Sequence, residues 1–422
     1  MAFYSALRYD IRGICKSPFQ IGNEAESVLR RRDGIAFVQA GSLVGAMRSW
    51  LANKNAEQAD QLFGTNQHEG SVMVSHGLFR KDTVEETRPR LKLNGHSGTV
   101  DGEKKFEVSA LRPGAEFTFT ILWTGKDQSA RTLAEEQLER IFNAIESGEI
   151  RFGAQKNNGF GVVSLKVCKR TYDMKNQADR QAWLKEDQAT EELPLCPHED
   201  RQYTIFTLYA YGSSVLTKGA APTHTYGDSY TGNLMAGNIP VISGASVKGA
   251  IRKRVVGIAE LCHVSPERVD ELFGRESDSE KGDCGIAGKI RFSEVTMEQS
   301  HTVHPITRIR VNRFTAGVLN TGLFAEKPLS TELAVQISVP KEDDLGCALI
   351  LFALRDLGAG LYSLGSGSAV GRGYLTPRGV VASVPGEGEL VMEFEENDIV
   401  IRGEEHLAEP WLKALGGKKN EN

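Results

Sequence analysis

The sequence predicts an α+β protein built from two tandem units, each with the element order βαββαβ. Three observations lead to this prediction. Four short motifs occur twice in the same order, alternating apolar and polar residues mark a strand at the start of each copy, and apolar residues at helical spacing follow the first motif of each copy. A split βαβ order of this kind is typical of a ferredoxin-like sheet with helices on one face.

The internal repeat extends over most of the chain. The motifs are a Ser-x-x-Gly-Ala-x-Arg segment, a Leu-Phe-Gly tripeptide, a basic strand ending in Asn, and a late glycine-rich loop. In the order given, they occupy 41–48 and 245–252, 62–64 and 272–274, 90–94 and 308–312, and 153–161 and 365–373, with offsets of 204, 210, 218 and 212 residues. Four landmarks at nearly one offset indicate a tandem duplication.

The elements follow in the same order in each copy. We expect opening strands over 5–14 and 203–211, then helices that begin at Ser42 and Ser246, each placed as an N-cap. The later elements complete each unit with a strand, a second helix, the glycine loop and a closing strand. These strands are expected over 116–123 and 332–339, and these helices over 133–146 and 345–357.

Charge and composition set the domain boundaries. We expect a first unit over 1–172, an acidic linker over 173–200, a second unit over 201–386 and an acidic C-terminal extension over 387–422. The whole chain has a net charge of −5, of which the linker contributes −5 and the extension −6. The two units together therefore carry +6, which suits a surface that binds phosphates.

Targeting segments and cysteine pairs are not evident in the sequence. No run approaches the roughly 20 apolar residues of a membrane helix, and the first residues lack a signal peptide's apolar run, so we expect a cytoplasmic protein without a membrane partner. Consecutive cysteines lie at least 22 residues apart, which excludes a CxxC motif. Cys262, His263 and Cys284 supply too few ligands to predict a structural zinc.

The first motif has the chemistry of an anion site. Backbone N–H groups at a helix N-terminus, a capping serine and basic side chains all favour a phosphodiester. Lys248 and Arg252 supply the charge in the second copy, whereas the first has Val44 at the lysine position and keeps Arg48. An ordinary capped helix with a solvated basic face is the alternative interpretation.

The glycine-rich loops also allow the backbone to approach a ligand, with Lys156 or Arg372 as the nearby charge. A dinucleotide-binding loop is excluded by context, because that fingerprint requires a strand before it and a helix after it. Here a helix precedes each loop and a strand follows. A plain glycine turn is the alternative for either loop taken alone.

Together these motifs resemble the RAMP superfamily of CRISPR-associated proteins, over nearly the whole chain and twice. Within it, the chain is similar to the backbone subunits of type III effector complexes, in the fused double form found in subtype III-D. The resemblance implies RRM-like units that grip a guide RNA (crRNA) and pair with other RAMP backbone subunits and the large subunit. It also implies thumb hairpins, expected within 93–107 and 311–327, that displace a base of the guide–target RNA duplex.

The motifs and the resemblance together predict a set of RNA-binding residues in both copies. These are Ser42, Arg48, Gly153, Lys156, Gly159, Gly161, Ser246, Lys248, Arg252, Arg308, Arg310, Arg313, Gly365, Gly371, Arg372 and Gly373.

The resemblance further implies an acid, on a loop some 18 residues before the motif serine, that cleaves target RNA with a divalent metal ion. Asp228 lies 18 residues before Ser246 and is the predicted catalytic residue and ligand of Mg²⁺ or Mn²⁺. A turn-forming aspartate is the alternative. In the first copy, Glu24 and Glu26 occupy this region and predict at most a weaker site.

Histidines give a third possibility. His224, four residues before Asp228, is a candidate assistant in proton transfer, and His301 and His304 flank the basic strand. The sequence thus leaves three functions open: an RNA-guided endoribonuclease, a scaffold that binds RNA without cutting it, and a guide-processing endonuclease that works through His224 or His304.

Overall fold

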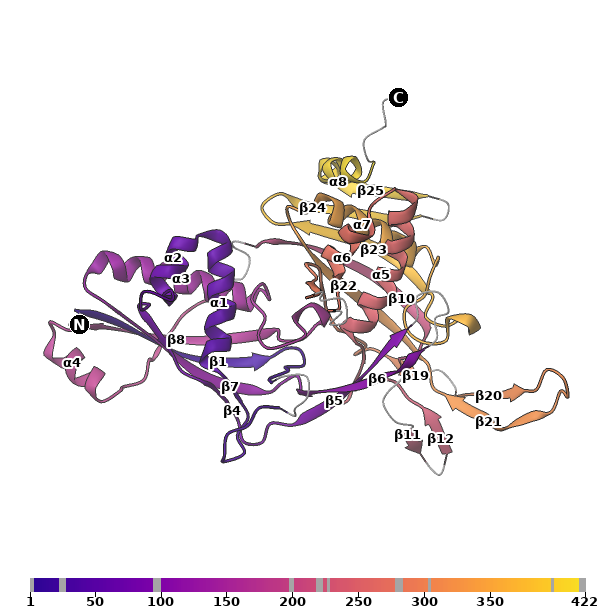
Figure 1. Cartoon of the computed structure of the whole chain (residues 1–422), viewed down its shortest axis with the longest axis horizontal. Helices are drawn as coiled ribbons and strands as arrows, with labels where there is room; N and C mark the ends of the chain where they lie inside the picture. The colour runs from indigo at the N-terminus through magenta and orange to yellow at the C-terminus, as the bar shows by residue number, and fades with distance from the viewer. Residues whose placement is uncertain are drawn as a thin grey trace. The chain divides into compact units, whose positions relative to one another are not determined.

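The computed structural model describes residues 4–22, 28–93, 100–196, 201–217, 223–225, 228–277, 284–302, 305–395 and 398–416. The chain forms two compact units (Figure 1). Unit 1 comprises Met1–Thr87, Val108–Lys156 and Phe160–Arg201, and unit 2 comprises Arg88–Glu107, Asn157–Gly159 and Gln202–Asn422. Two segments of the first sequence copy therefore belong to the second compact unit.

The sheet of unit 1 is antiparallel, in the order β2-β4-β7-β1-β8-β9, with β3 also paired to β7. Its strands and helices are β1 (Ser5–Cys15), β2 (Phe37–Val38), α1 (Ala40–Lys54), α2 (Ala56–Phe63), β3 (Val72–Val74), β4 (Gly77–Phe79), β7 (Glu116–Gly125), α3 (Gln128–Glu146), β8 (Val163–Asp173), α4 (Gln177–Leu184) and β9 (Glu191–Glu192). Strand β1 is antiparallel to both β7 and β8. Alternate β1 residues, Leu7, Tyr9 and Ile11, join the core beneath α1 and α3.

Unit 2 repeats this architecture in the order β17-β22-β10-β23-β24-β25. The main sheet and its helices are β10 (Tyr203–Val215), α5 (Gly244–Leu261), α6 (Pro266–Phe273), β17 (Arg291–Phe292), β19 (His301–Thr302), β22 (Leu329–Pro340), α7 (Asp344–Gly358), β23 (Leu375–Val384), β24 (Gly388–Phe394), β25 (Ile399–Gly403) and α8 (Ala408–Leu415). A short three-stranded sheet consists of β13 (Met235–Ala236), β14 (Ile239–Ile242) and β18 (Val295–Thr296), and β15 (Gly274–Arg275) pairs with β16 (Ile286–Ala287).

Two hairpins complete the elements (Figure 1). Strands β5 (Glu85–Leu93) and β6 (Val100–Leu111) form a two-stranded sheet, and β20 (Ile306–Val311) pairs with β21 (Val318–Glu326). Hairpins are therefore present at both predicted places, but they begin at Glu85 and Ile306, before the predicted bounds of 93–107 and 311–327. The expected strands and second helices are also present, each a few residues longer at one or both ends, and the prediction of two tandem α+β units is confirmed.

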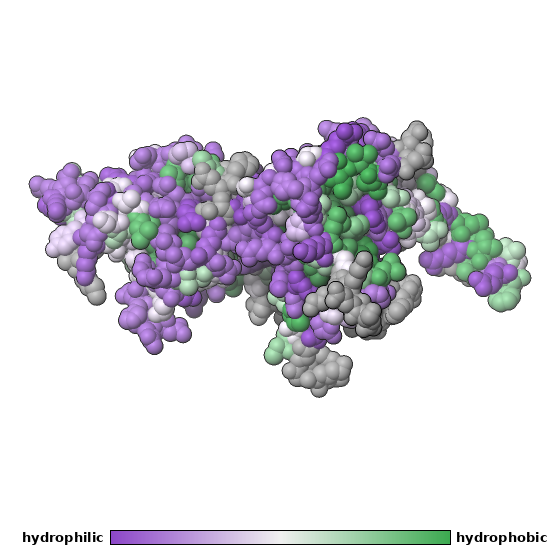
Figure 2. Space-filling model, turned by 90° about the horizontal axis from the view of Figure 1, so that it is seen from above, coloured by the Kyte–Doolittle hydropathy of each residue, from purple (hydrophilic) through white to green (hydrophobic). Residues whose placement is uncertain are grey.

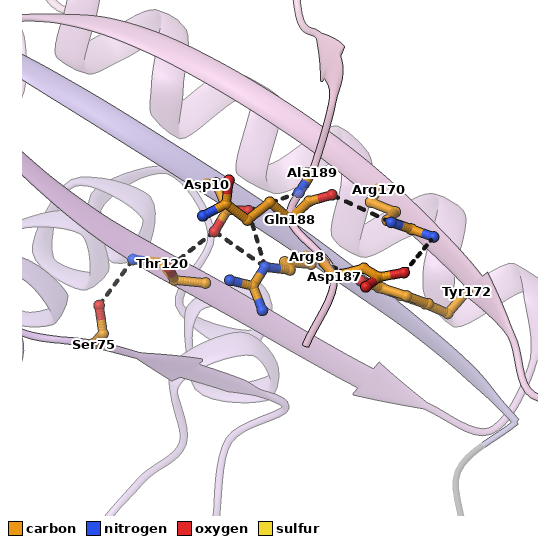
Figure 3. Close-up of polar contacts among 9 residues, drawn as sticks. All are labelled: Arg8, Asp10, Ser75, Thr120, Arg170, Tyr172, Asp187, Gln188 and Ala189. Carbon is orange, nitrogen blue, oxygen red and sulfur yellow. Dashed lines mark hydrogen bonds and ion pairs between the residues drawn. The ribbon is translucent and has the colours of Figure 1, made fainter. Parts of the chain in front are cut away.

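The segment expected to be an acidic linker folds onto unit 1. Helix α4 packs Trp183 against Tyr172 of β8, and β9 adds a strand beside β8. Residues 187–189 cross the sheet face that α1 and α3 leave uncovered (Figure 3). There the Ala189 N–H donates to the Asp10 carboxylate at 2.7 Å, and Arg8 Nε donates to both Asp10 oxygens at 3.1 and 2.9 Å.

The C-terminal extension likewise belongs to a fold. Strands β24 and β25 extend the sheet of unit 2, and Trp411 of α8 is buried against Phe206 in its core. Among the helices of the described residues, none has the length and apolar character needed to cross a membrane.

Candidate nucleic-acid interface

The N-terminus of α5 is built around two serines. Ser243, not Ser246, is the N-cap: its side chain accepts the Ser246 N–H at 3.2 Å, and the two hydroxyls lie 3.0 Å apart. The expectation that Ser246 caps the helix is therefore wrong, because α5 begins two residues before it. Ser246 stands exposed in the first turn, where the helix dipole is positive, and Lys248 lies two residues further on.

The N-terminus of α1 is completed differently. The predicted cap Ser42 lies inside the helix, and the N-cap residue Gln39 makes no side-chain capping bond. Instead the Ala40 N–H donates to Nδ1 of His76, which comes from the loop before β4. The imidazole of His76 therefore already accepts the hydrogen bond of one backbone N–H group that an anion would need at this end of α1.

The motif arginines hold the helix pairs together in both units. Arg48 contacts Asp60 of α2 at 2.6 Å, and Arg252 contacts Asp270 of α6 at 2.8 Å. Both pairs are partly exposed. Sequence reasoning considered these arginines only as phosphate ligands and missed the two acids, which lie in the same place before each Leu-Phe-Gly.

The glycine loops are close copies of one backbone design. The N–H of Ala154 donates to the Gln20 carbonyl at 3.1 Å, and the N–H of Ser366 donates to the Leu216 carbonyl at 2.7 Å. A Cβ on Gly153 or Gly365 would meet those same carbonyl oxygens at 2.3 and 2.8 Å, and both glycines have positive φ. Close packing of each loop against the chain just after the opening strand, at Gln20 in unit 1 and Leu216 in unit 2, thus accounts for these glycines without a ligand.

Arg372 has a structural partner that the sequence did not reveal. Its Nη1 donates at 2.5 Å to Oε2 of Glu326, at the end of β21, and Arg308 Nη1 approaches the same oxygen at 3.4 Å. Arg372 is only 4% exposed and Glu326 5%. The carboxylate of Glu326 therefore joins the glycine loop to both strands of the β20–β21 hairpin.

In unit 1, apolar side chains make the corresponding contact between glycine loop and hairpin, which we call the joint. Phe160 precedes Gly161 as Arg372 precedes Gly373, and it is buried in a small cluster with Val108 and Ala110 of β6. The glycine loop is thus tied to a hairpin strand in both units, by packing in one and by charge in the other.

Asp228 lies on a hairpin that shares a sheet with β20 and β21. Strands β11 (Thr223–Thr225) and β12 (Asp228–Thr231) are antiparallel, and β12 runs parallel to β21, with Thr231 opposite Glu326. The sheet order is β11-β12-β21-β20. His224, opposite Ser229, is on the same hairpin, so the backbone brings both predicted residues to one edge of this sheet.

The β20–β21 hairpin presents apolar side chains to solvent (Figure 2). Exposed along it are Ile309, Val311, Val318 and Leu323, and Phe314 in the turn is almost fully exposed. The predicted RNA ligands Arg310 and Arg313 are exposed on the same hairpin. A surface of this kind combines apolar contact with positive charge, as base-stacking surfaces do.

Unit 2 also holds residues from the first copy. Arg88 and Glu294 form a buried ion pair at 3.2 Å, and the Asn157 side chain donates to the Gly288 carbonyl at 2.5 Å. A Cβ on Gly159 would meet the Glu294 N at 2.9 Å. Gly159, predicted to face RNA, therefore also serves close backbone packing.

Several predictions fall outside the described part of the chain. Glu24, Glu26 and His304 are not described, and nothing is described of the side chains of Asp228 and His224. Among the described residues, no group of three or more His, Cys, Asp or Glu side chains is placed to hold a metal ion. The metal-ligand and catalytic assignments of Asp228 stay predictions.

Comparison with known families agrees with this geometry. The model of the RAMP superfamily matches residues 14–164 and 234–376, one match in each repeat. The chain belongs to the RAMP superfamily. Membership supports a CRISPR-associated, RNA-binding role, and its two matched regions agree with a tandem two-unit RAMP protein. No curated protein matches the sequence.

Proposed function

We propose that this RAMP protein is a backbone subunit of a type III CRISPR ribonucleoprotein, that it binds guide RNA with both units, and that it cleaves complementary target RNA through Asp228. The pairing of β12 with β21 carries the proposal. It puts the backbone of Asp228 in one sheet with the hairpin that we expect to displace a base. A displaced base leaves its neighbouring phosphate open to attack.

The chemistry needs few groups. A carboxylate beside a displaced nucleotide assists attack by the 2′-hydroxyl on the adjacent phosphate, in which the P–O5′ bond breaks and the 5′-oxygen leaves with a proton, so that a 2′,3′-cyclic phosphate and a 5′-hydroxyl end form. One carboxylate also suits Mg²⁺ or Mn²⁺ by donor chemistry, since such ions are often held by one or two carboxylates with substrate phosphate oxygens and water as the other ligands. A bound ion would neutralise charge at the phosphate. Asp228 would hold the ion or accept the proton.

Guide binding rests on the start of α5. Exposed Ser246, the positive end of the helix dipole in the first turn and Lys248 together favour a phosphate. Replacing one phosphate-binding lysine lowers the slope of log K against log salt by about 1. We therefore expect Lys248→Gln to weaken guide RNA binding and reduce this slope, whereas Lys413→Gln, which changes an exposed lysine of α8, leaves both unchanged.

Cleavage is tested in the assembled complex. Asp228→Asn is expected to abolish cleavage of a labelled complementary RNA in the presence of Mg²⁺ while the target still binds. Ser229→Ala, one residue further along β12, is the matched control and keeps activity. If every product persists with Asp228→Asn, the chain is a scaffold and the catalytic assignment is wrong. Cleavage of repeat RNA by the purified chain without metal would instead favour guide processing.

A further inference from the structure

The open face of the unit 2 sheet carries three exposed tyrosines that no part of the proposed function uses. Tyr209 and Tyr211 alternate on the central strand β10, and Tyr374 immediately precedes β23; they are 48%, 37% and 43% exposed. The intervening residues Leu208 and Ala210 and the following Leu375 are buried in the core. The three rings therefore stand on the face away from the helices.

The register brings the three tyrosines side by side. Tyr211 is opposite Thr376, and Gly212 is opposite Leu375. The Gly373 N–H donates to the Ser214 carbonyl at 2.9 Å, so the same register continues and puts Tyr374 opposite Ser213. Tyr374 is thus the diagonal neighbour of Tyr211, and neighbours of this kind lie about 7–8 Å apart. Tyr209 and Tyr211, two residues apart on one strand, are separated by about 7 Å.

The surroundings leave the ring faces accessible. Tyr209 is flanked across the strands by Ala334 and Gly379, which are too small to cover it. The Tyr211 hydroxyl is hydrogen-bonded to the Ser330 hydroxyl at 2.7 Å, which holds that ring in position. Arg378 and Glu332 beside them pair with each other at 2.5 Å, so the face is close to neutral.

We infer that this tyrosine face is a second RNA-binding surface, which takes unpaired bases of a single-stranded RNA by stacking. The inference rests on the RNA-binding role of the family and is independent of cleavage at Asp228. Sheets of the RRM type stack two or three splayed bases on aromatic side chains of their central strands. The spacing of about 7 Å fits splayed bases better than the roughly 3.4 Å between stacked bases of a helix.

Two observations favour RNA over a protein partner. The face continues directly into Gly373 of the glycine loop and Ser330 at the base of the β20–β21 hairpin, which are elements of the proposed RNA interface. The residues that surround the tyrosines, such as Ala334, Gln336 and Thr376, are small or polar, and the aliphatic side chains farther along this face, Ile205 and Val381, are only partly exposed, unlike the apolar centre of a stable protein interface. Neutral aromatic surfaces of this kind recognise bases, while phosphates are held elsewhere.

The test uses the full chain and a fluorescein-labelled oligouridylate of 15 nucleotides, followed by fluorescence anisotropy. The triple variant Tyr209→Ser, Tyr211→Ser, Tyr374→Ser is expected to bind at least about 10-fold more weakly, because each stacked base contributes substantially to affinity. Its slope of log K against log salt stays unchanged, since no phosphate contact is lost. The triple Tyr→Phe variant keeps the rings and binds within about 2-fold of the parent chain.

Matched controls separate this inference from the proposed function. Tyr4→Ser removes an exposed tyrosine of unit 1 and leaves affinity unchanged. Lys248→Gln lowers the salt slope if the proposed phosphate site is right, whatever the tyrosines do. Unchanged affinity in the Ser triple variant overturns the tyrosine face, as does failure of the parent chain to bind the oligouridylate. The inference is also overturned if the triple Tyr→Ser variant binds the oligouridylate normally but does not assemble into the ribonucleoprotein complex, because the face is then a contact with another protein. If the Ser variant does not fold, Tyr211→Ser alone decides.

Discussion

The open faces of the two sheets show how the repeats have diverged. The glycine-loop offset of 212 makes Val163 equivalent to Leu375, and these two residues pair with Cys15 and Gly212, so Arg12 and Ile14 of unit 1 occupy the positions of Tyr209 and Tyr211 in unit 2. In unit 1 the face is charged and crossed by residues 187–189 (Figure 3). In unit 2 it is aromatic and exposed.

The helix-facing side changes much less. Tyr9 and Ile11 in unit 1 correspond to Phe206 and Leu208 in unit 2, and all four are buried. Core positions are restricted because close packing penalises polar groups and changes of volume. Positions on the open face have no such restriction, so one copy has acquired a covering segment and the other an exposed surface.

The largest expected effect concerns the joint between glycine loop and hairpin. Arg372→Met leaves the buried Glu326 carboxylate with only the longer contact to Arg308, and we expect a loss of about 3–5 kcal/mol in the free energy of unfolding of unit 2. Denaturant unfolding with hydrogen exchange of β20 and β21 measures it. A loss below about 1 kcal/mol would contradict the assignment.

The apolar joint of unit 1 supplies the matched control. The double variant Arg372→Phe, Glu326→Val copies the contact of Phe160 with Val108, and we expect it to recover most of the lost stability. A buried ion pair is often replaced by apolar side chains without loss, because the cost of desolvating two charges disappears. If the double variant is as unstable as Arg372→Met, the two joints are not equivalent.

The next largest effect concerns residues 187–189, which cover the open face of the unit 1 sheet. Asp10→Asn weakens the bonds from Arg8, Thr120 and Ala189, and we expect local opening of residues 187–192 to become easier by about 1–2 kcal/mol at pH 7. Hydrogen exchange of these amides reports it. Tyr209→Phe, on the exposed face of the unit 2 sheet, serves as the control and changes exchange in neither unit.

The same carboxylate gives unit 1 a pH dependence. Burial raises the pKa of Asp10, but hydrogen bonds from Arg8, Ala189 and Thr120 outweigh it and bring the pKa below its usual value. A lowered folded-state pKa contributes stability that is present above about pH 4, the ordinary range of an aspartate, and is lost as the pH falls through the folded value. Exchange at 187–192 should therefore differ between parent and Asp10→Asn at pH 7 and converge once the pH is below the folded-state pKa of Asp10.

A smaller effect is expected where the two units are alike. The Arg48–Asp60 and Arg252–Asp270 pairs are partly exposed, so Asp60→Asn and Asp270→Asn should each change stability by less than about 1 kcal/mol. Thermal unfolding of the two variants measures this. A marked difference between them would show that the repeats use this pair differently.

The last prediction concerns the chemical reactivity of the cysteine thiols and involves no change in stability. Burial raises the pKa of Cys15 in unit 1, and burial likewise raises the pKa of Cys347 in unit 2 to about 12. The thiolate is the nucleophile, so neither should react with iodoacetamide at pH 8, whereas exposed Cys196 and Cys284 should. Peptide mass spectrometry follows the labelling. Modification of Cys15 before Cys196 would contradict the packing of unit 1.

The sequence by itself determined the duplication, the order of elements and the family, because these depend on local periodicity and on motif spacing. The alternation over 203–211 already placed Tyr209 and Tyr211 on one face. The sequence predicted that Ser42 and Ser246 cap their helices, but the position of a cap depends on a few backbone angles. The Ser243 side chain and His76 Nδ1 accept hydrogen bonds from the backbone N–H groups at these helix starts instead.

Only the tertiary structure decided which charges are already paired. Arg372 and Glu326 lie 46 residues apart, and Arg252 and Asp270 lie 18 apart, so no local pattern shows that they meet. It also decided that the acidic segment covers unit 1 and that residues 88–107 and 157–159 belong to unit 2. Burial and pairing arise from contacts distant in sequence, and these determine whether a basic residue is bound within the fold or presented to RNA.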